Sequence, residues 1–135
     1  MSTTSRIAVK IKDGYRAIYC HWDGYTSYMY PMLIENYNSK EKAEELVSLG
    51  NASFIEKNIA PPKGEYHHFT NPYPETSVFY HRDRGEEFRS SFYSTKDQLL
   101  KVDWFVYIWE DGKWTAYQNG KEAIMTEEFT IGAKQ

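Results

Sequence analysis

The stretch RIAVKIKDGYRAIYCHW, residues 6–22, predicts the first two strands of a β-sheet. Its second half places Tyr19 and His21 on one face and Cys20 on the other, because successive strand residues point to opposite faces. Between the halves, Asp13-Gly14 is a two-residue turn signal, since glycine accepts a positive φ angle. The first half alternates apolar with polar or small residues, at Ile7, Val9 and Ile11.

Two helices are expected after this hairpin. The segment PMLIENYN, residues 31–38, has helical spacing and begins with Pro31, a residue that favours the first helical turn. The segment SKEKAEELVSLG, residues 39–50, has a serine N-cap, an apolar stripe and a closing glycine. Residues 56–76 hold four of the five prolines and predict an irregular surface loop within the domain.

The C-terminal half returns to strand patterns. SVFYHRD (77–83) predicts a strand, FRSSFYS (88–94) a short one, and residues 102–124 a hairpin or meander. Residues 126–135 are expected to form a final turn and a loose tail. The predicted fold is a single α+β domain spanning residues 1–135, with an antiparallel sheet of about five to six strands and two helices on one face.

Composition narrows the function classes. The net charge is −3, so no broad basic surface for nucleic acid is expected. The single cysteine excludes an internal disulfide framework and suits a reducing compartment. No apolar run is long enough for a membrane span, and the N-terminus lacks the apolar run of a signal peptide. The expected location is the cytoplasm.

Aromatic residues are unusually frequent. They make up 17% of the chain, with 12 tyrosines and 4 tryptophans, more than a core of this size requires. Tyrosine and tryptophan are enriched at interfaces, but aromatic residues also favour strands. A sheet-rich core is therefore an equally good explanation of the surplus. The densest stretch is YCHWDGYTSYMY, residues 19–30, which we interpret as one wall of a recognition site.

Two His-x-Asp triplets, His21 to Asp23 and His81 to Asp83, each follow a predicted strand. In extended backbone the two polar residues of a triplet point the same way. If the strands were neighbours, the four groups could converge on Zn, Mn or Fe. Such triplets also occur by chance, and a half-buried histidine held by its carboxylate or by backbone is the favoured interpretation. No metal site is assigned, and no cofactor is expected.

Other reactive groups are expected to be structural. Cys20 and its neighbour His21 should face opposite sides of a strand, so the imidazole is poorly placed to activate the thiol. A lone cysteine is usually a small buried apolar residue. The pair His67-His68 lies in the proline-rich loop and is expected to be solvated.

The segment RDRGEEFR, residues 82–89, contains three arginines. Arginine forks match phosphate geometry, and beside aromatic faces they suit a nucleotide. Ion pairing with the acidic residues of the same segment is the alternative. The candidate ligand-binding residues are Tyr19, His21, Trp22, Asp23, Tyr25, Tyr28, His81, Arg82 and Arg84.

The segment DWFVYIWEDGKW, residues 103–114, is apolar on both faces of a predicted strand. Either this strand is central and covered on both sides, or one face meets a partner or a second copy of the chain. The candidate interface residues are Trp104, Tyr107, Trp109 and Trp114.

Three segments resemble a family of small phage and prophage proteins that share the sequence IYCHWDGY. They are SRIAVKIKDGYRAIYCHWDGY (5–25), ENYNSKEKAEELVSLGNAS (35–53) and YHRDRGE (80–86), and the resemblance spans about residues 5–90. It implies no catalytic residues. It implies the context of a phage accessory gene, whose products often block a host defence protein, sequester a nucleotide signal or redirect a host enzyme.

Three functional hypotheses follow. The leading one is a non-enzymatic phage accessory protein that binds and sequesters a small nucleotide signal in the host cytosol. The second is a protein-binding inhibitor of a host defence enzyme or nuclease, for which a homodimer is a further expectation. The third is a metal-dependent hydrolase. Binding is favoured over turnover because no catalytic motif is recognisable.

Overall fold

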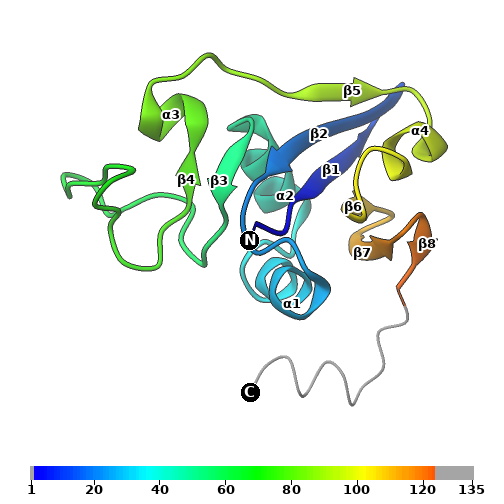
Figure 1. Cartoon of the computed structure of the whole chain (residues 1–135), viewed down its shortest axis with the longest axis horizontal. Helices are drawn as coiled ribbons and strands as arrows, with labels where there is room; N and C mark the ends of the chain where they lie inside the picture. Colours follow the sequence, from blue (N-terminus) through cyan, green and yellow to red (C-terminus); the bar gives the residue numbers. More distant parts are fainter. Residues whose placement is uncertain (1, 124–135) are drawn as a thin grey trace.

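The protein is described by a computed structural model over residues 2–123 (Figure 1). This part of the chain forms one α+β domain. Its helices are α1 (Thr26–Asn36), α2 (Lys40–Ser48), α3 (Tyr80–Arg84) and α4 (Lys96–Leu100). Its strands are β1 (Ser5–Ile11), β2 (Gly14–Cys20), β3 (Ala52–Phe54), β4 (Val78–Phe79), β5 (Ser91–Tyr93), β6 (Phe105–Glu110), β7 (Lys113–Gln118) and β8 (Lys121–Glu122). The tail predicted over residues 126–135 lies outside the described residues.

The eight described strands form one mixed sheet in the order β4-β3-β2-β1-β6-β7-β8, with β5 paired to β2. The predicted antiparallel sheet is therefore wrong in part, because β1 pairs with β6 and β2 with β3 in parallel. Parallel neighbours need a connection that returns the chain to the starting end of the sheet. The helices α1 and α2 make that return between β2 and β3.

The first hairpin forms as predicted, but its turn lies one residue earlier. Ile11 pairs with Gly14, so the two turn residues are Lys12 and Asp13. Gly14 is required for close approach: a Cβ there would lie 2.4 Å from the Tyr93 carbonyl oxygen of β5. The later Asp-Gly and Asn-Gly turns do use positive φ angles, at residues 111–112 and 119–120.

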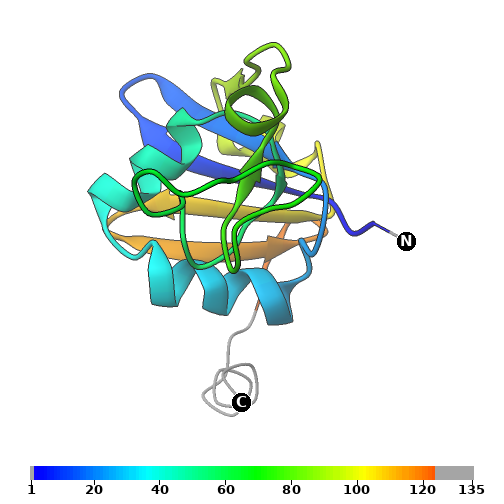
Figure 2. The ribbon, with the colours of Figure 1, turned by 90° about the vertical axis from the view of Figure 1, so that its left-hand side faces the viewer.

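The two longer helices lie on one face of the sheet, as predicted, with α2 starting at its serine cap (Figure 2). Ser39 Oγ accepts a hydrogen bond from the Lys42 backbone N–H at 3.2 Å. Helix α1 begins at Thr26, and Pro31 lies inside it, so the prediction that Pro31 opens the helix is wrong. Pro31 is buried with Met29 and Leu33, and this burial offsets the hydrogen bond that proline cannot make.

The sheet is covered on both faces around β6, which corrects the predicted interface. Tyr107, Trp109 and Trp114 are buried in the core beneath α1 and α2. The opposite face of β6 packs against α4 through a smaller cluster that contains Leu99. Both apolar faces of this segment are thus accounted for by the covered-strand alternative. Of the four candidates, Trp104 alone is exposed, at 52%.

The segment 56–76 has no helix or strand among its residues, which confirms the predicted loop. Figure 2 faces the β4 edge of the sheet and shows this loop folded over it. The predicted strand over 77–83 is short: β4 ends at Phe79, and residues 80–84 form α3. None of the described helices has the length and apolarity that crossing a membrane would require.

Candidate functional site

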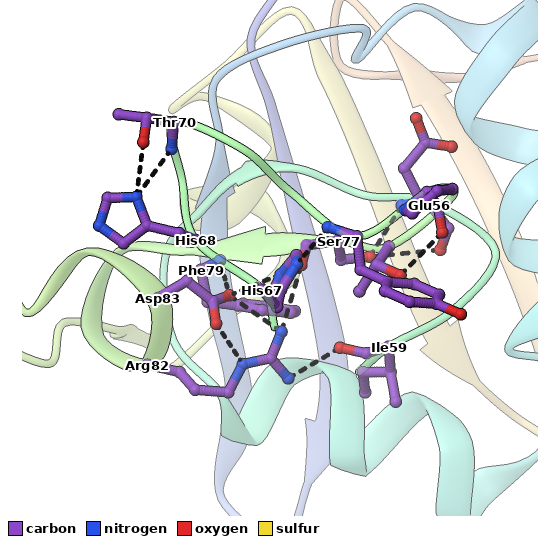
Figure 3. Close-up of polar contacts among 12 residues, drawn as sticks. Glu56, Ile59, His67, His68, Thr70, Ser77, Phe79, Arg82 and Asp83 are labelled. Carbon is purple, nitrogen blue, oxygen red and sulfur yellow. Dashed lines mark hydrogen bonds and ion pairs between the residues drawn. The ribbon is translucent and has the colours of Figure 1, made fainter. Parts of the chain in front are cut away.

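Side chains take the place of a neighbouring strand along the outer edge of β4 (Figure 3). The Phe79 backbone N–H donates to Asp83 Oδ2 at 2.8 Å. The Ser77 carbonyl accepts from Arg82 Nη2 at 3.2 Å and is bonded to His67 Nε2 at 3.0 Å. An unpaired strand edge would expose these backbone groups. The loop and α3 therefore close the sheet with polar side chains.

The Arg82 guanidinium hydrogen-bonds to groups along this edge. Its guanidinium donates to the Asp83 carboxylate at 2.8 Å and, through Nη1, to the Ile59 carbonyl at 2.8 Å. The role predicted for Arg82 in binding phosphate is therefore corrected to a structural one. The ion-pair alternative is confirmed for all three arginines of the segment, because Arg82 pairs with Asp83, Arg84 with Glu86 and Arg89 with Glu87. Asp83 is the most buried of the three carboxylates, at 6% exposed.

His67 is buried, which contradicts the expectation that it is solvated. Its Nδ1 accepts a hydrogen bond from the Tyr73 backbone N–H at 2.9 Å, so Nε2 carries the proton and donates to the Ser77 carbonyl. The Ser77 hydroxyl contacts Glu56 instead of the imidazole. These groups lie close together but do not form a serine nucleophile with an adjacent base.

The two His-x-Asp triplets do not converge. His81 and Asp83 lie on a helix, where residues two apart point in different directions. His81 Nδ1 lies 2.8 Å from the Glu86 carbonyl oxygen, and Asp23 has a φ of 58°. No group of three or more metal-ligating side chains occurs among residues 2–123. The geometry therefore does not favour the metal-dependent hydrolase.

Cys20 lies within the core and contacts the Trp22 carbonyl oxygen. Burial raises the pKa of its thiol to about 12. At pH 8 the reactive thiolate is therefore scarce, and we expect the native protein to resist labelling by iodoacetamide. In denaturant the same thiol should react at the rate of a free cysteine. Fast native labelling at pH 8, followed by mass spectrometry, would contradict this burial.

One half of the sheet face opposite α1 and α2 carries aromatic and arginine side chains. Arg6 on β1 pairs in register with Tyr19 on β2, and its guanidinium lies over the Tyr19 ring at 5.2 Å from the ring centroid. The Tyr19 hydroxyl lies 2.6 Å from His21 Nδ1. Helix α4 covers the other half of this face, near Ala8 and Ala17.

Tyr80 and Arg84 of α3 lie beside these residues. Asn51 connects the two parts, because its side chain accepts from the Tyr19 backbone N–H and its carbonyl accepts from the Tyr80 backbone N–H. The Arg84 guanidinium lies over the Tyr80 ring at 4.6 Å from the centroid. We call Arg6, Tyr19, His21, Tyr80 and Arg84 the aromatic–arginine surface.

Neighbouring groups set the ionisation state of the tyrosines and the ion pairing of the arginines on this surface. Burial, followed by the charge of Asp103, raises the pKa of the Tyr19 phenol, and burial with the nearby Tyr19 raises that of Tyr80. Both phenols therefore stay neutral near pH 7. Arg84 forms an exposed ion pair with Glu86 at 2.7 Å. The surface thus presents neutral rings and two arginines, each beside a carboxylate, since Arg6 Nε lies 3.8 Å from Asp103 Oδ2.

The structure brings together four of the predicted ligand-binding residues: Tyr19, His21, Trp22 and Arg84. The Trp22 ring meets the His21 ring edge-on at a centroid distance of 4.8 Å. The others lie elsewhere. Tyr25 precedes α1, the Tyr28 hydroxyl donates to the Ile55 carbonyl, His81 packs against Phe88, and Asp23 lies in the turn after β2.

Sequence reasoning missed Arg6 and Tyr80. The predicted register hid Arg6: with Asp13-Gly14 as the turn, Tyr19 would lie opposite Ala8, whereas the turn at Lys12-Asp13 places it opposite Arg6. Tyr80 had no local signal, since the pairing of β3 with β2 and β4 brings it there. No family model, curated protein or solved structure matches the chain.

Proposed function

We propose that this protein binds a small nucleotide on the aromatic–arginine surface without turning it over. The observation that carries the proposal is two neighbouring arginine–tyrosine contacts: Arg6 over Tyr19 on the sheet face that α4 leaves open, and Arg84 over Tyr80 on α3. Asn51 links them through its hydrogen bonds to the Tyr19 and Tyr80 backbones. Aromatic side chains stack on nucleobases, and arginines pair with phosphate oxygens. Sequestration of a signal by a phage accessory protein is the role that the sequence resemblance adds to this proposal.

The arrangement supports binding more than catalysis. The imidazole of His21 lies beside the Tyr19 ring, and its Nδ1 is engaged by the Tyr19 hydroxyl. The sole cysteine is buried, and the His67, Asp83 and Ser77 groups maintain the β4 edge. General base or nucleophilic catalysis would need such groups within reach of the ligand.

The proposal is tested by calorimetric titration with adenosine 5′-monophosphate, using adenosine as the probe that lacks phosphate. We expect binding of the nucleotide in the micromolar range and recovery of the nucleotide unchanged. Arg84→Gln should weaken nucleotide binding about 10-fold, because a charge-assisted hydrogen bond to phosphate is lost. Adenosine binding should respond much less to the same change.

The matched control is Arg89→Gln. Arg89 is also an exposed arginine near α3, and it pairs with Glu87 at 2.9 Å, outside the aromatic–arginine surface. Equal losses in the two variants would mean that general charge, and not this surface, attracts the nucleotide. Absence of heat with purine and pyrimidine nucleotides at millimolar concentration would overturn the proposal.

A protein partner is the second candidate, because exposed aromatic rings flank α3. Tyr66 and Phe69 lie on the loop and Phe88 follows the helix, all with large exposed fractions. Exposed tyrosine, phenylalanine and arginine are typical of protein interfaces. The predicted inhibitor surface thus moves from the buried C-terminal hairpin to the region around α3. The homodimer stays a prediction.

A further inference from the structure

A cleft of about 420 Å³ lies between the end of α4, the start of β6 and the β7–β8 turn. Trp104 lines it, and its backbone is fixed on both sides. The Trp104 N–H donates to Asp103 Oδ1 at 2.8 Å, and its carbonyl accepts from the Asn119 N–H at 2.8 Å. A large exposed ring held by rigid backbone beside a concavity is typical of a binding site.

The cleft adjoins the aromatic–arginine surface. Asp103 lines the cleft, and its carboxylate accepts from the Thr4 hydroxyl and lies 3.8 Å from Arg6 Nε. Arg6 in turn lies over Tyr19. One row of contacts therefore runs from Asp103, the chain neighbour of Trp104, through Arg6 to Tyr19 and His21.

The strand registers give the distance between the backbones at His21 and Trp104, the proposed positions of the two bases. Extending the β1–β2 register by one residue and the β1–β6 register by two places Thr4 between His21 and Trp104. Neighbouring strands lie about 4.8 Å apart, so the backbones at His21 and Trp104 are about 10 Å apart. Two bases joined by one phosphodiester can span such a distance, with the phosphate above Thr4 and beside Arg6, which lies two residues further along the same face of β1.

Charge in this region suits a phosphodiester. Arg6 is 24% exposed at its side chain, and its buried Nε has no hydrogen-bond partner among the described residues. Lys101 lines the cleft and adds a second positive charge. Because the Asp103 carboxylate offsets the charge of Arg6, the net positive charge beside the cleft is that of Lys101.

We propose that the nucleotide ligand has two bases, one on the aromatic–arginine surface and one on Trp104 in the cleft. This inference rests on the proposed function and specifies the ligand class as a dinucleotide. A long single strand is not favoured, because the chain carries a net charge of −3, and proteins that bind a strand without sequence preference use a positively charged groove.

The test compares adenosine 5′-monophosphate with the linear dinucleotide ApA by calorimetric titration. We expect ApA to bind about 10-fold more tightly, since a second stacked base adds that much or more. Trp104→Ala should remove most of this advantage, so the ratio of the two affinities falls toward one. Trp104→Phe should retain most of it, because the ring remains. The indole N–H signal of Trp104, assigned from the Trp104→Phe spectrum, should shift with ApA.

The control variant is Tyr66→Ala, which removes an exposed ring outside both sites. It should leave the affinity ratio unchanged. If the mononucleotide binds but ApA binds no more tightly, or if Trp104→Ala leaves the ratio unaltered, the dinucleotide inference is wrong and the proposed function stands. If neither probe binds, the proposed function itself fails. Much tighter binding of an eight-nucleotide strand than of ApA would overturn the assignment to a dinucleotide.

Discussion

Trp114→Ala is expected to lower the free energy of unfolding by about 3–5 kcal/mol, the range for truncating a large buried aromatic residue. Trp114 is 2% exposed, and its ring packs edge-on against Trp109 at 5.6 Å. Its indole N–H donates to the Tyr37 carbonyl at 2.9 Å, which ties β7 to the segment after α1. The substitution leaves a cavity and an unpaired buried carbonyl. Chemical denaturation followed by circular dichroism measures the loss.

Trp104→Ala is the matched control, because it removes the same side chain from a site that is 52% exposed. It should change the unfolding free energy by about 0.5 kcal/mol or less. Should Trp114→Ala fail to fold, Trp114→Phe provides a milder test: it keeps most of the apolar volume and loses the hydrogen bond. Equal small effects at both tryptophans would mean that Trp114 lies at the surface after all.

Asp83→Ala is expected to destabilise the protein by about 3 kcal/mol, because removing one partner of a buried ion pair leaves the other group unpaired. The Asp83 carboxylate accepts from the Phe79 backbone and from Arg82, and it lies 3.7 Å from His67 Nε2. Without this carboxylate, the Phe79 backbone N–H at the outer edge of β4 loses its hydrogen-bond acceptor. Arg82 is 27% exposed, so water can solvate part of its charge.

Glu86→Gln is the control for this change. It removes a carboxylate that lies just after α3 and pairs with Arg84, but at 47% exposure. Exposed ion pairs contribute about 0–1 kcal/mol, so the variant should behave like the wild type on denaturation. Asp83→Asn keeps one oxygen that can accept from the Phe79 N–H. Its loss of stability should lie between those of Asp83→Ala and Glu86→Gln. A loss at Asp83 no larger than at Glu86 would refute the strand-edge role.

The resemblance to phage proteins motivates the proposed sequestration role but names no residue on the aromatic–arginine surface. The binding tests with Arg84 and Trp104 variants decide the surface independently of that context. A protein that binds ApA through these residues would fit other roles for a nucleotide receptor equally well.

Short-range patterns determined much of the local structure. The β1–β2 hairpin, the Ser39 cap of α2, the turns at 111–112 and 119–120 and the irregular 56–76 loop all follow from a few consecutive residues. Each depends on backbone preference or on hydrogen bonds within a few residues, so the sequence carries the signal directly. The burial of Cys20 likewise follows from strand alternation.

Only the tertiary structure decided which strands pair and which groups the charged side chains contact. The parallel pairs β1–β6 and β2–β3 join segments separated by long connections, which no local pattern reports. Those pairings bury Trp109 and Trp114 and bring Arg6 to Asp103. The physical reason is that burial and ion pairing depend on which residues meet across the sheet. The sequence by itself therefore identified Tyr19, His21 and Arg84 as candidates, and the fold alone decided which of their neighbours share a surface.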